Sequence, residues 1–204
     1  MPHDAHRRDR IRGLALLLCL AGLMATTRAS LATHYYIPSG SMRPTLQVGD
    51  RVLVNKAAYG VRVPLTHRWL LERAGPRPGD VVVFDSPADG ELLVKRVVAG
   101  PGDRVAVRGG RVWRNGAWQP VRVDSRGETW ETLAGRRHRL SLARGGGPDC
   151  GPLTVPPRRY LVLGDNRGDS ADGRFFGLVR RRAILGRVSG VFMRDGHPEW
   201  RPME

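Results

Sequence analysis

The sequence contains little cysteine, and its histidines are scattered. Cys19 and Cys150 are the only cysteines among 204 residues, too few for a disulfide scaffold or a cysteine-type zinc site. One lies in an apolar run and the other in a stretch rich in Gly and Pro, so we expect no bridge between them. The six histidines include no i, i+4 pair, which argues against a histidine metal helix. We therefore expect no metal and no cofactor.

Lysine is almost absent. Only two of the 34 basic residues are lysines, Lys56 and Lys95, and the others are arginines. The net charge of +15 is compatible with a nucleic-acid or a membrane-surface partner, although a general preference for arginine explains most of the bias without any function. Because arginine keeps its proton in a protein and lysine can lose it, the two lysines are the only basic side chains suited to act as a base.

The sequence also lacks an apolar run of the usual transmembrane length near its N-terminus. Residues 13–27 are free of charge, which is shorter than the roughly 20 residues of a spanning helix but typical of a signal-peptide core. Arg12 and Arg28 could lengthen the span by snorkelling. Three interpretations stay open: an uncleaved anchor over 13–32, a signal cut after Ala32, or a buried helix. The first two leave the basic segment 1–12 in the cytoplasm and export the rest.

Helical periodicity is scarce in the remaining chain, which predicts a mostly β protein. From Tyr35 onward, short apolar runs are broken by Gly, Pro and Asp, the pattern of short strands. Asn115-Gly116 predicts a two-residue hairpin turn, and only 65–74 and 171–176 suggest short helices or turns. The predicted strands are 51–55, 80–84, 92–98, 104–107, 111–113, 118–123, 160–163 and 183–192.

One segment differs in composition from its surroundings. Residues 105–157 are rich in Arg, Gly and Pro and have little apolar continuity. We interpret them as a small inserted β subdomain that separates two parts of one main domain, 35–104 and 158–204.

Ser39 and Ser41 flank Gly40 in a predicted turn just before a strand. One interpretation is a linker that leaves a membrane segment. The other is a nucleophile held in a tight turn, since glycine permits close backbone approach and an exposed N–H beside the serine could donate to an oxyanion. This stretch alone leaves both open.

Lys95 is expected in a strand, on the same face as Leu93 and Val97. It could be a strand-end lysine that snorkels to water. Alternatively, burial and the like charge of Arg96 would both lower its pKa, from about 10.4 to about 7–8. That range suits a general base.

A dense polar loop covers residues 164–174. It fails the pattern of a calcium loop, because Arg167 stands where an oxygen ligand belongs. It could be a cluster of Asx turns and nothing more. It could instead support an active site, with Ser170 bonded to a neutral lysine amine and Asp172 paired with Arg174.

Together and in this order, the stretches PSGSMRPT, VKRVVAGPGD and GDNRGDSADGRFFG closely resemble those of bacterial type I signal peptidases, a family of membrane-bound Ser/Lys proteases. The resemblance implies Ser41 as nucleophile and Lys95 as base. It implies Ser39 as an oxyanion donor beside the backbone N–H of Ser41. It further implies that Ser170 orients the lysine and that Asp172 and Arg174 form a supporting pair.

The same resemblance implies a fold, a substrate and a location. We expect a signal-peptidase-like β-sheet catalytic domain behind one transmembrane helix, anchored in the lipid bilayer of the cytoplasmic membrane and facing the periplasm. The substrates would be signal peptides of exported preproteins with small residues at Ala-x-Ala sites. Nucleic acid is not an expected partner. The expected pocket residues are Ile37, Met42, Leu46, Leu93 and Val94.

The chain departs from the usual family loop, because Gly168 replaces an Asp, Asp169 an Asn and Gly173 a Ser.

The alternatives to a general signal peptidase include a specialised conjugation or pilin-type maturation peptidase and a self-cleaving repressor-type protease. A Ser-His-Asp triad would need His67 or His138, and neither lies in a matching motif. A non-enzymatic exported β domain that binds anionic polymers would survive loss of Ser41.

Overall fold

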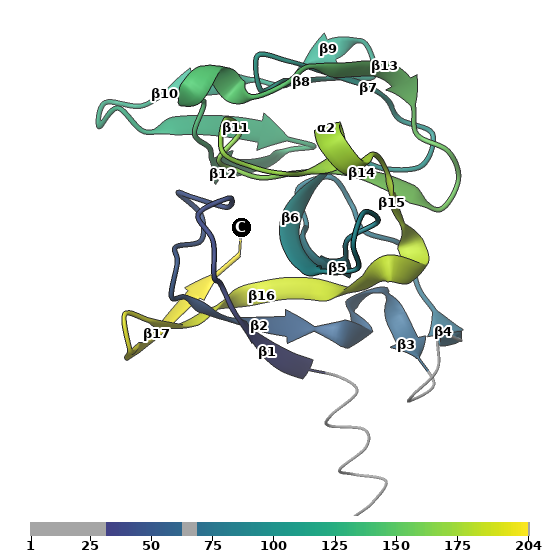
Figure 1. Cartoon of the computed structure of the whole chain (residues 1–204), viewed down its shortest axis with the longest axis vertical. Helices are drawn as coiled ribbons and strands as arrows, with labels where there is room; N and C mark the ends of the chain where they lie inside the picture. The colour runs from purple at the N-terminus through teal and green to yellow at the C-terminus, as the bar shows by residue number, and fades with distance from the viewer. Residues whose placement is uncertain (1–31, 63–68, 204) are drawn as a thin grey trace, which may run out of the picture.

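The computed structural model describes residues 32–62 and 69–203 (Figure 1). The predicted basic segment 1–12, nearly all of the predicted anchor 13–32, and His67 lie outside these described residues. Within the described part, no helix has the length and apolar character needed to cross a membrane.

The described chain is mostly β, as predicted, and is organised around one antiparallel sheet (Figure 1). Valines and other β-branched residues at alternating positions favour these strands, since they pack well on a pleated surface. In order across the sheet, the strands are β1 (Ala32–Tyr36), β2 (Arg51–Asn55), β16 (Ile184–Arg194), β5 (Val81–Asp85), β6 (Leu92–Ala99), β14 (Arg159–Leu163) and β15 (Val179–Arg180), with β17 (His197–Pro202) also paired to β16.

Three smaller sheets complete the fold. A pair is formed by β3 (Gly60–Arg62) and β4 (Trp69–Glu72). Three strands form a second sheet, β10 (Val121–Val123), β11 (Thr129–Leu133) and β12 (Arg136–Arg139). Four strands form a third, in the order β13 (Cys150–Thr154), β7 (Arg104–Arg108), β8 (Arg111–Arg114) and β9 (Ala117–Trp118). The short helical turns are η1 (Lys56–Tyr59), η2 (Arg144–Gly146), α2 (Gly173–Phe176) and η3 (Arg181–Ala183).

The hairpin prediction is confirmed. β8 pairs with β9 in an antiparallel hairpin, and Asn115 and Gly116 between them have φ of 50° and 95°. Positive φ at both central residues is what a two-residue type I′ turn requires. Most predicted strand boundaries also agree with the structure within two residues.

Two predicted elements are wrong in part. The first is the helix or turn predicted over 65–74. Residues 69–72 form strand β4 instead, because they pair with β3, with Gly60 opposite Glu72. Residues 65–68 lie outside the described residues. The predicted strand 118–123 is two strands, β9 and β10. Pro120 lies between them, and proline has no N–H to continue a ladder.

The buried core links the predicted insertion to the main sheet. One hydrophobic cluster joins Leu161 and Leu163 of β14 to Val107 and Leu133 of the 105–157 segment. In Figure 1, the three- and four-stranded sheets lie together above β5 and β6. β6 therefore runs through the middle of the molecule, where the polar residues described next converge.

Candidate active site

The turn that carries Ser41 is fixed by its own backbone and by the core. Between β1 and β2, the N–H of Arg43 donates to Gly40 O at 3.0 Å and that of Leu46 to Met42 O at 2.9 Å. The side chains of Met42 and Leu46 are buried. Ser41 itself stays half-buried, so its hydroxyl is held in place but remains accessible.

Lys95 on β6 contacts the Ser41 hydroxyl directly. Its Nζ donates to Ser41 Oγ at 2.6 Å, and the lysine is only 3% exposed. Burial lowers the pKa of Lys95 to about 8, although the negative charges of Asp172 and Asp165 oppose the shift. Once deprotonated, the same amine can accept the Ser41 proton across this contact.

The expected contribution of Arg96 to that pKa is wrong. Neighbouring strand residues point to opposite faces, and Arg96 forms a buried ion pair with Asp165 at 2.8 Å. Its guanidinium also donates to Gly79 O at 2.8 Å. Its positive charge is thus engaged on the other side of β6, and burial alone lowers the pKa of Lys95.

Two hydrogen-bond donors lie beside the nucleophile. Ser39 Oγ is 3.4 Å from Ser41 Oγ, and the backbone N–H of Ser41 makes no hydrogen bond within the described residues. A hydroxyl and an unengaged N–H next to an attacking oxygen are the groups an oxyanion hole uses.

Asn166 and Gly164 are site residues that our sequence analysis missed. The N–H of Asn166 donates to Ser41 O at 3.0 Å, and its Nδ2 donates to Gly40 O at 3.2 Å. A Cβ on Gly164 would clash with both Ser170 Oγ and Ser41 O. The 164–174 loop therefore packs directly onto the serine turn. The motif was visible in the sequence, but this contact over more than 120 residues was not.

The predicted hydrogen bond from Ser170 to Lys95 is absent. Ser170 is buried, yet its Oγ has no hydrogen-bond partner among the described residues. The Lys95 amine is directed to Ser41 instead, while Ser170 Oγ faces Gly164. Ser170 thus lies at the edge of the site with an unused hydroxyl.

Asp172 and Arg174 form the predicted pair. Their side chains are fully buried and joined at 2.8 Å, and Asp172 Oδ2 also accepts the N–H of Gly164 at 3.0 Å. Arg174 donates to Gly146 O at 2.5 Å and to Arg167 O at 2.6 Å. The pair therefore holds the 164–174 loop against segment 105–157.

The expected pocket residues separate into two groups. Ile37, Met42 and Leu46 are buried in one cluster, against which Val94 packs. Leu93 packs against a different cluster, because it faces the other side of β6. The structure thus does not place the five side chains in one lining.

A buried charge network supports the serine turn from behind. Thr45 Oγ1 donates to Asp165 Oδ2 at 2.5 Å, and Arg167 on the same loop pairs with Glu131 of β11 at 2.5 Å. Burial would raise the pKa of Glu131, but the charge and hydrogen bond of Arg167, together with the interactions of His138, outweigh it and lower the pKa to about 2. His138 Nε2 lies 3.2 Å from Glu131 Oε2, so His138 belongs to this network and not to a Ser41 triad. Among the described residues, no group of His, Cys, Asp and Glu is placed to hold a metal ion.

The structure also explains the departures of the 164–174 loop. A Cβ on Gly168 would overlap Ala143 O, and a Cβ on Gly173 would lie 2.8 Å from Val162 O. Neither position has room for a side chain. Asp169 is exposed and pairs with Arg144 at 3.1 Å.

Comparisons with known proteins identify the family of this chain. The family model described as "Signal peptidase, peptidase S26" matches residues 10–193. The chain is 34% identical to a signal peptidase I of Pseudomonas fluorescens, over 87% of this chain and 70% of that one. It is 36% identical to a signal peptidase I of Leptolyngbya laminosa, over 86% and 73%.

A solved signal peptidase I from Enterococcus faecalis has a TM-score of 0.41 at 26% identity, covering 56% of this chain and 97% of that one. The assignment rests on the sequence matches, which extend over most of the chain. This chain belongs to the signal peptidase, peptidase S26 family.

Proposed function

We propose that this chain is a signal peptidase I, a membrane-bound serine endopeptidase that removes N-terminal signal peptides from exported preproteins. The observation that carries the proposal is the 2.6 Å contact between Lys95 Nζ and Ser41 Oγ. The contact involves an amine that burial has brought to a pKa of about 8. A nucleophile in reach of a base with a near-neutral pKa is the requirement for acyl transfer.

In the acylation step, neutral Lys95 accepts the proton of Ser41 while Ser41 Oγ attacks the scissile carbonyl. The developing oxyanion accepts hydrogen bonds from the Ser41 N–H and from Ser39 Oγ. Lys95 then returns the proton to the leaving amine, which departs as the N-terminus of the mature protein. The signal peptide remains as an ester on Ser41.

In the deacylation step, Lys95 takes a proton from water, and the resulting hydroxide attacks the ester. The carboxylate of the signal peptide leaves, and the proton returns to Ser41 Oγ. Asn166, Asp172 and Arg174 hold the serine turn and the loop in place during both steps and do not touch the reacting atoms.

We expect small residues at the cleavage site, of the Ala-x-Ala type. Small side chains contribute little burial energy, so selectivity has to come partly from backbone pairing of an extended peptide. Anchoring through residues 13–32 would add to it by raising the effective concentration of membrane-bound substrate. In this proposal, segment 105–157 is an insertion, and 35–104 with 158–204 form the catalytic domain on the extracytoplasmic face.

The test is preprotein processing by the full chain in detergent, with Ser41→Ala beside Ser125→Ala. Ser125 is an exposed serine in a turn of the inserted segment, so its variant controls for the loss of one hydroxyl. Ser41→Ala should abolish cleavage and Ser125→Ala should retain it. Full cleavage by Ser41→Ala would remove the proposed nucleophile. Cleavage of one partner only, among a panel of preproteins, would favour a specialised maturation peptidase.

A further inference from the structure

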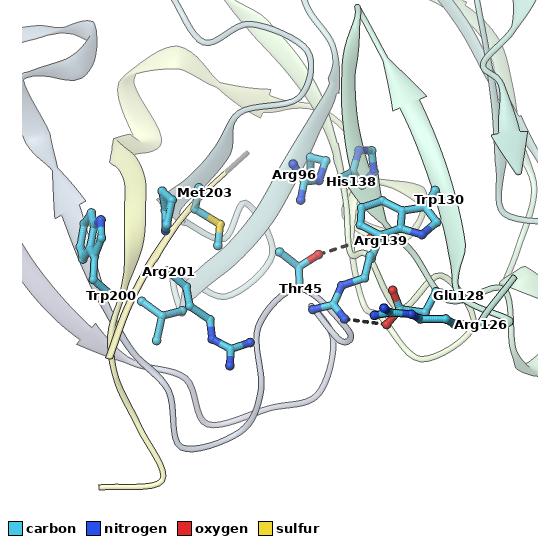
Figure 2. A pocket seen from close by; sticks show the side chains of 12 residues that line it. Thr45, Arg96, Arg126, Glu128, Trp130, His138, Arg139, Trp200, Arg201 and Met203 are labelled. Carbon is cyan, nitrogen blue, oxygen red and sulfur yellow. Dashed lines mark hydrogen bonds and ion pairs between the residues drawn. The ribbon is translucent and has the colours of Figure 1, made fainter. Parts of the chain in front are cut away.

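A cavity lies behind the Ser41 turn, on the opposite side of β6 from Lys95. Its volume is about 500 Å³, and it lies between Thr45 of the turn, strands β11 and β12, and strand β17. Figure 2 shows Arg201 and Met203 on one side and Arg139 with Glu128 on the other. Arg96 lines this cavity and faces away from Lys95, so the cavity is separate from the Ser41–Lys95 contact.

The lining contains four arginines, and three of them are paired with carboxylates. Arg96 pairs with Asp165 at 2.8 Å. Arg139 holds Glu128 at 2.9 Å and Arg201 holds Glu199 at 2.6 Å. Arg126 is exposed and has no side-chain partner within the described residues. Arg126 therefore carries the positive charge at this cavity that no carboxylate of the described residues neutralises, and an anion would be the matching ligand.

A buried histidine supplies an independent sign of a ligand. His138 lines the cavity and is only 3% exposed. Its Nε2 lies 3.2 Å from Glu131 and 3.9 Å from Asp165, and neither ring nitrogen makes a hydrogen bond within the described part of the chain. A buried polar atom without a partner is costly, so a ligand group that reached Nδ1 from the cavity would relieve that cost.

The chemistry of His138 favours a phosphate monoester over a carboxylate. With Nε2 directed at Glu131, neutral imidazole leaves Nδ1 as an acceptor, and imidazolium makes it a donor. A phosphate monoester has a second pKa near 6, so it presents either a hydroxyl or an anionic oxygen to that nitrogen. A carboxylate can only accept.

The remaining wall is apolar and aromatic. Trp130, Trp200 and Met203 line the cavity beside the arginines, and a volume of this size suits a small organic molecule. We infer that this cavity is a second binding site, for a phosphate monoester that carries an apolar body. The inference stands apart from the peptidase activity, since it uses neither Ser41 nor Lys95.

The test uses the full chain in maltoside micelles and phenyl phosphate as the probe. Titration calorimetry measures affinity for phenyl phosphate and for inorganic phosphate, and ¹⁵N NMR follows the imidazole of His138. We expect saturable binding, tighter for phenyl phosphate, with a shift of the His138 Nδ1 signal. Arg126→Gln should weaken binding about tenfold, the loss of one charge-assisted hydrogen bond.

Arg122→Gln is the matched control. Arg122 is an exposed arginine of strand β10 that does not line this cavity, so its variant removes the same charge and should leave the affinity unchanged. Equal weakening by the two variants, no saturation, or an unmoved His138 signal at saturation would overturn the inference. A competition experiment with soluble short-chain phosphatidic acid then identifies where the phosphate monoester comes from. If phosphatidic acid displaces phenyl phosphate, the natural ligand is a lipid headgroup. If it does not, the ligand is a free monoester.

Discussion

At the scale of single residues, the environment of Lys95 determines what its amine can do. An exposed lysine is protonated at neutral pH and cannot accept a proton. Lys95 is buried beside Ser41, and its pKa is lowered to about 8. Both the rate of cleavage and the stability of the fold should therefore depend on pH through Lys95.

The first prediction concerns the pH dependence of cleavage. Because only the neutral amine can accept the Ser41 proton, kcat/KM on a signal-peptide substrate should rise about tenfold per pH unit below about pH 8. It should level off above that pH. Steady-state kinetics from pH 5 to pH 10 measures this profile. A profile that is flat between pH 6 and pH 9 would exclude Lys95 as the base.

The second prediction is that Lys95→Met stabilises the protein at pH 6. The pKa of Lys95 falls from 10.5 in the unfolded chain to about 8 in the folded one, so the folded state binds this proton more weakly. Folding stability is therefore lost as pH falls from about 10.5 to 8, and it stays lost below 8.

Removing the buried charge should raise the free energy of unfolding by about 2 kcal/mol at pH 6, after allowance for the lost contact with Ser41. At pH 10.5 the gain should vanish. Urea denaturation at both pH values measures the difference. A variant less stable than wild type at pH 6 would contradict this account of Lys95.

The sequence was most informative at this scale. Motifs and the scarcity of lysine pointed to Ser41 and Lys95, which the structure places 2.6 Å apart. The prediction that Arg96 lowers the pKa of Lys95 is wrong, because neighbouring side chains on a strand point to opposite faces. The Ser170 bond failed because a motif does not fix which atom a hydroxyl faces.

At the scale of elements, the 164–174 loop links the serine turn to segment 105–157. It bonds the Ser41 carbonyl through Asn166, and Arg174 donates to Gly146 O of that segment. Segment 105–157 and the Ser41 turn are thus connected through one loop, and close backbone contact at glycines makes the connection possible.

Gly168→Ala should therefore lower stability and activity together. Its Cβ would overlap Ala143 O, and overpacking of this kind typically costs about 1–3 kcal/mol. Thermal unfolding and preprotein cleavage measure the two effects. Gly100→Ala is the control, since a Cβ there meets Tyr160 at an ordinary 3.5 Å. Equal behaviour of the two variants would show that the loop contact is not required.

Element prediction succeeded where the apolar pattern was clear and failed where arginine obscured it. The valine-rich strands β2, β5 and β6 were predicted within one residue. β12 was not predicted, because it has the sequence Arg-Arg-His-Arg and only His138 in it is buried. Without apolar residues at alternate positions, the sequence gives no sign of a strand there. Its partner β11 was not predicted either.

At the scale of the whole molecule, the charge and the N-terminal segment bear on where the enzyme acts. The net charge of +15 fits a protein that works beside an anionic membrane surface. Residues 13–27 carry no charge, and we expect the segment 13–32 to anchor the chain.

Deleting residues 1–31 tests this expectation. The truncated chain should move from the membrane fraction to the soluble fraction. It should cleave a short soluble peptide at nearly the wild-type rate, but it should process a preprotein in lipid vesicles about 100-fold more slowly, since tethering no longer raises the effective concentration. Retention of the truncated chain in membranes would place the anchor elsewhere.

The central claim is that Ser41 and Lys95 form the catalytic dyad, and the two lysines of the chain allow one direct measurement. Lys95→Arg keeps the positive charge but removes the ability to lose a proton, and Lys56→Arg makes the same change at the only other lysine. Single-turnover cleavage of one preprotein should be abolished in Lys95→Arg and unchanged in Lys56→Arg. Cleavage by Lys95→Arg at the wild-type rate would contradict the dyad.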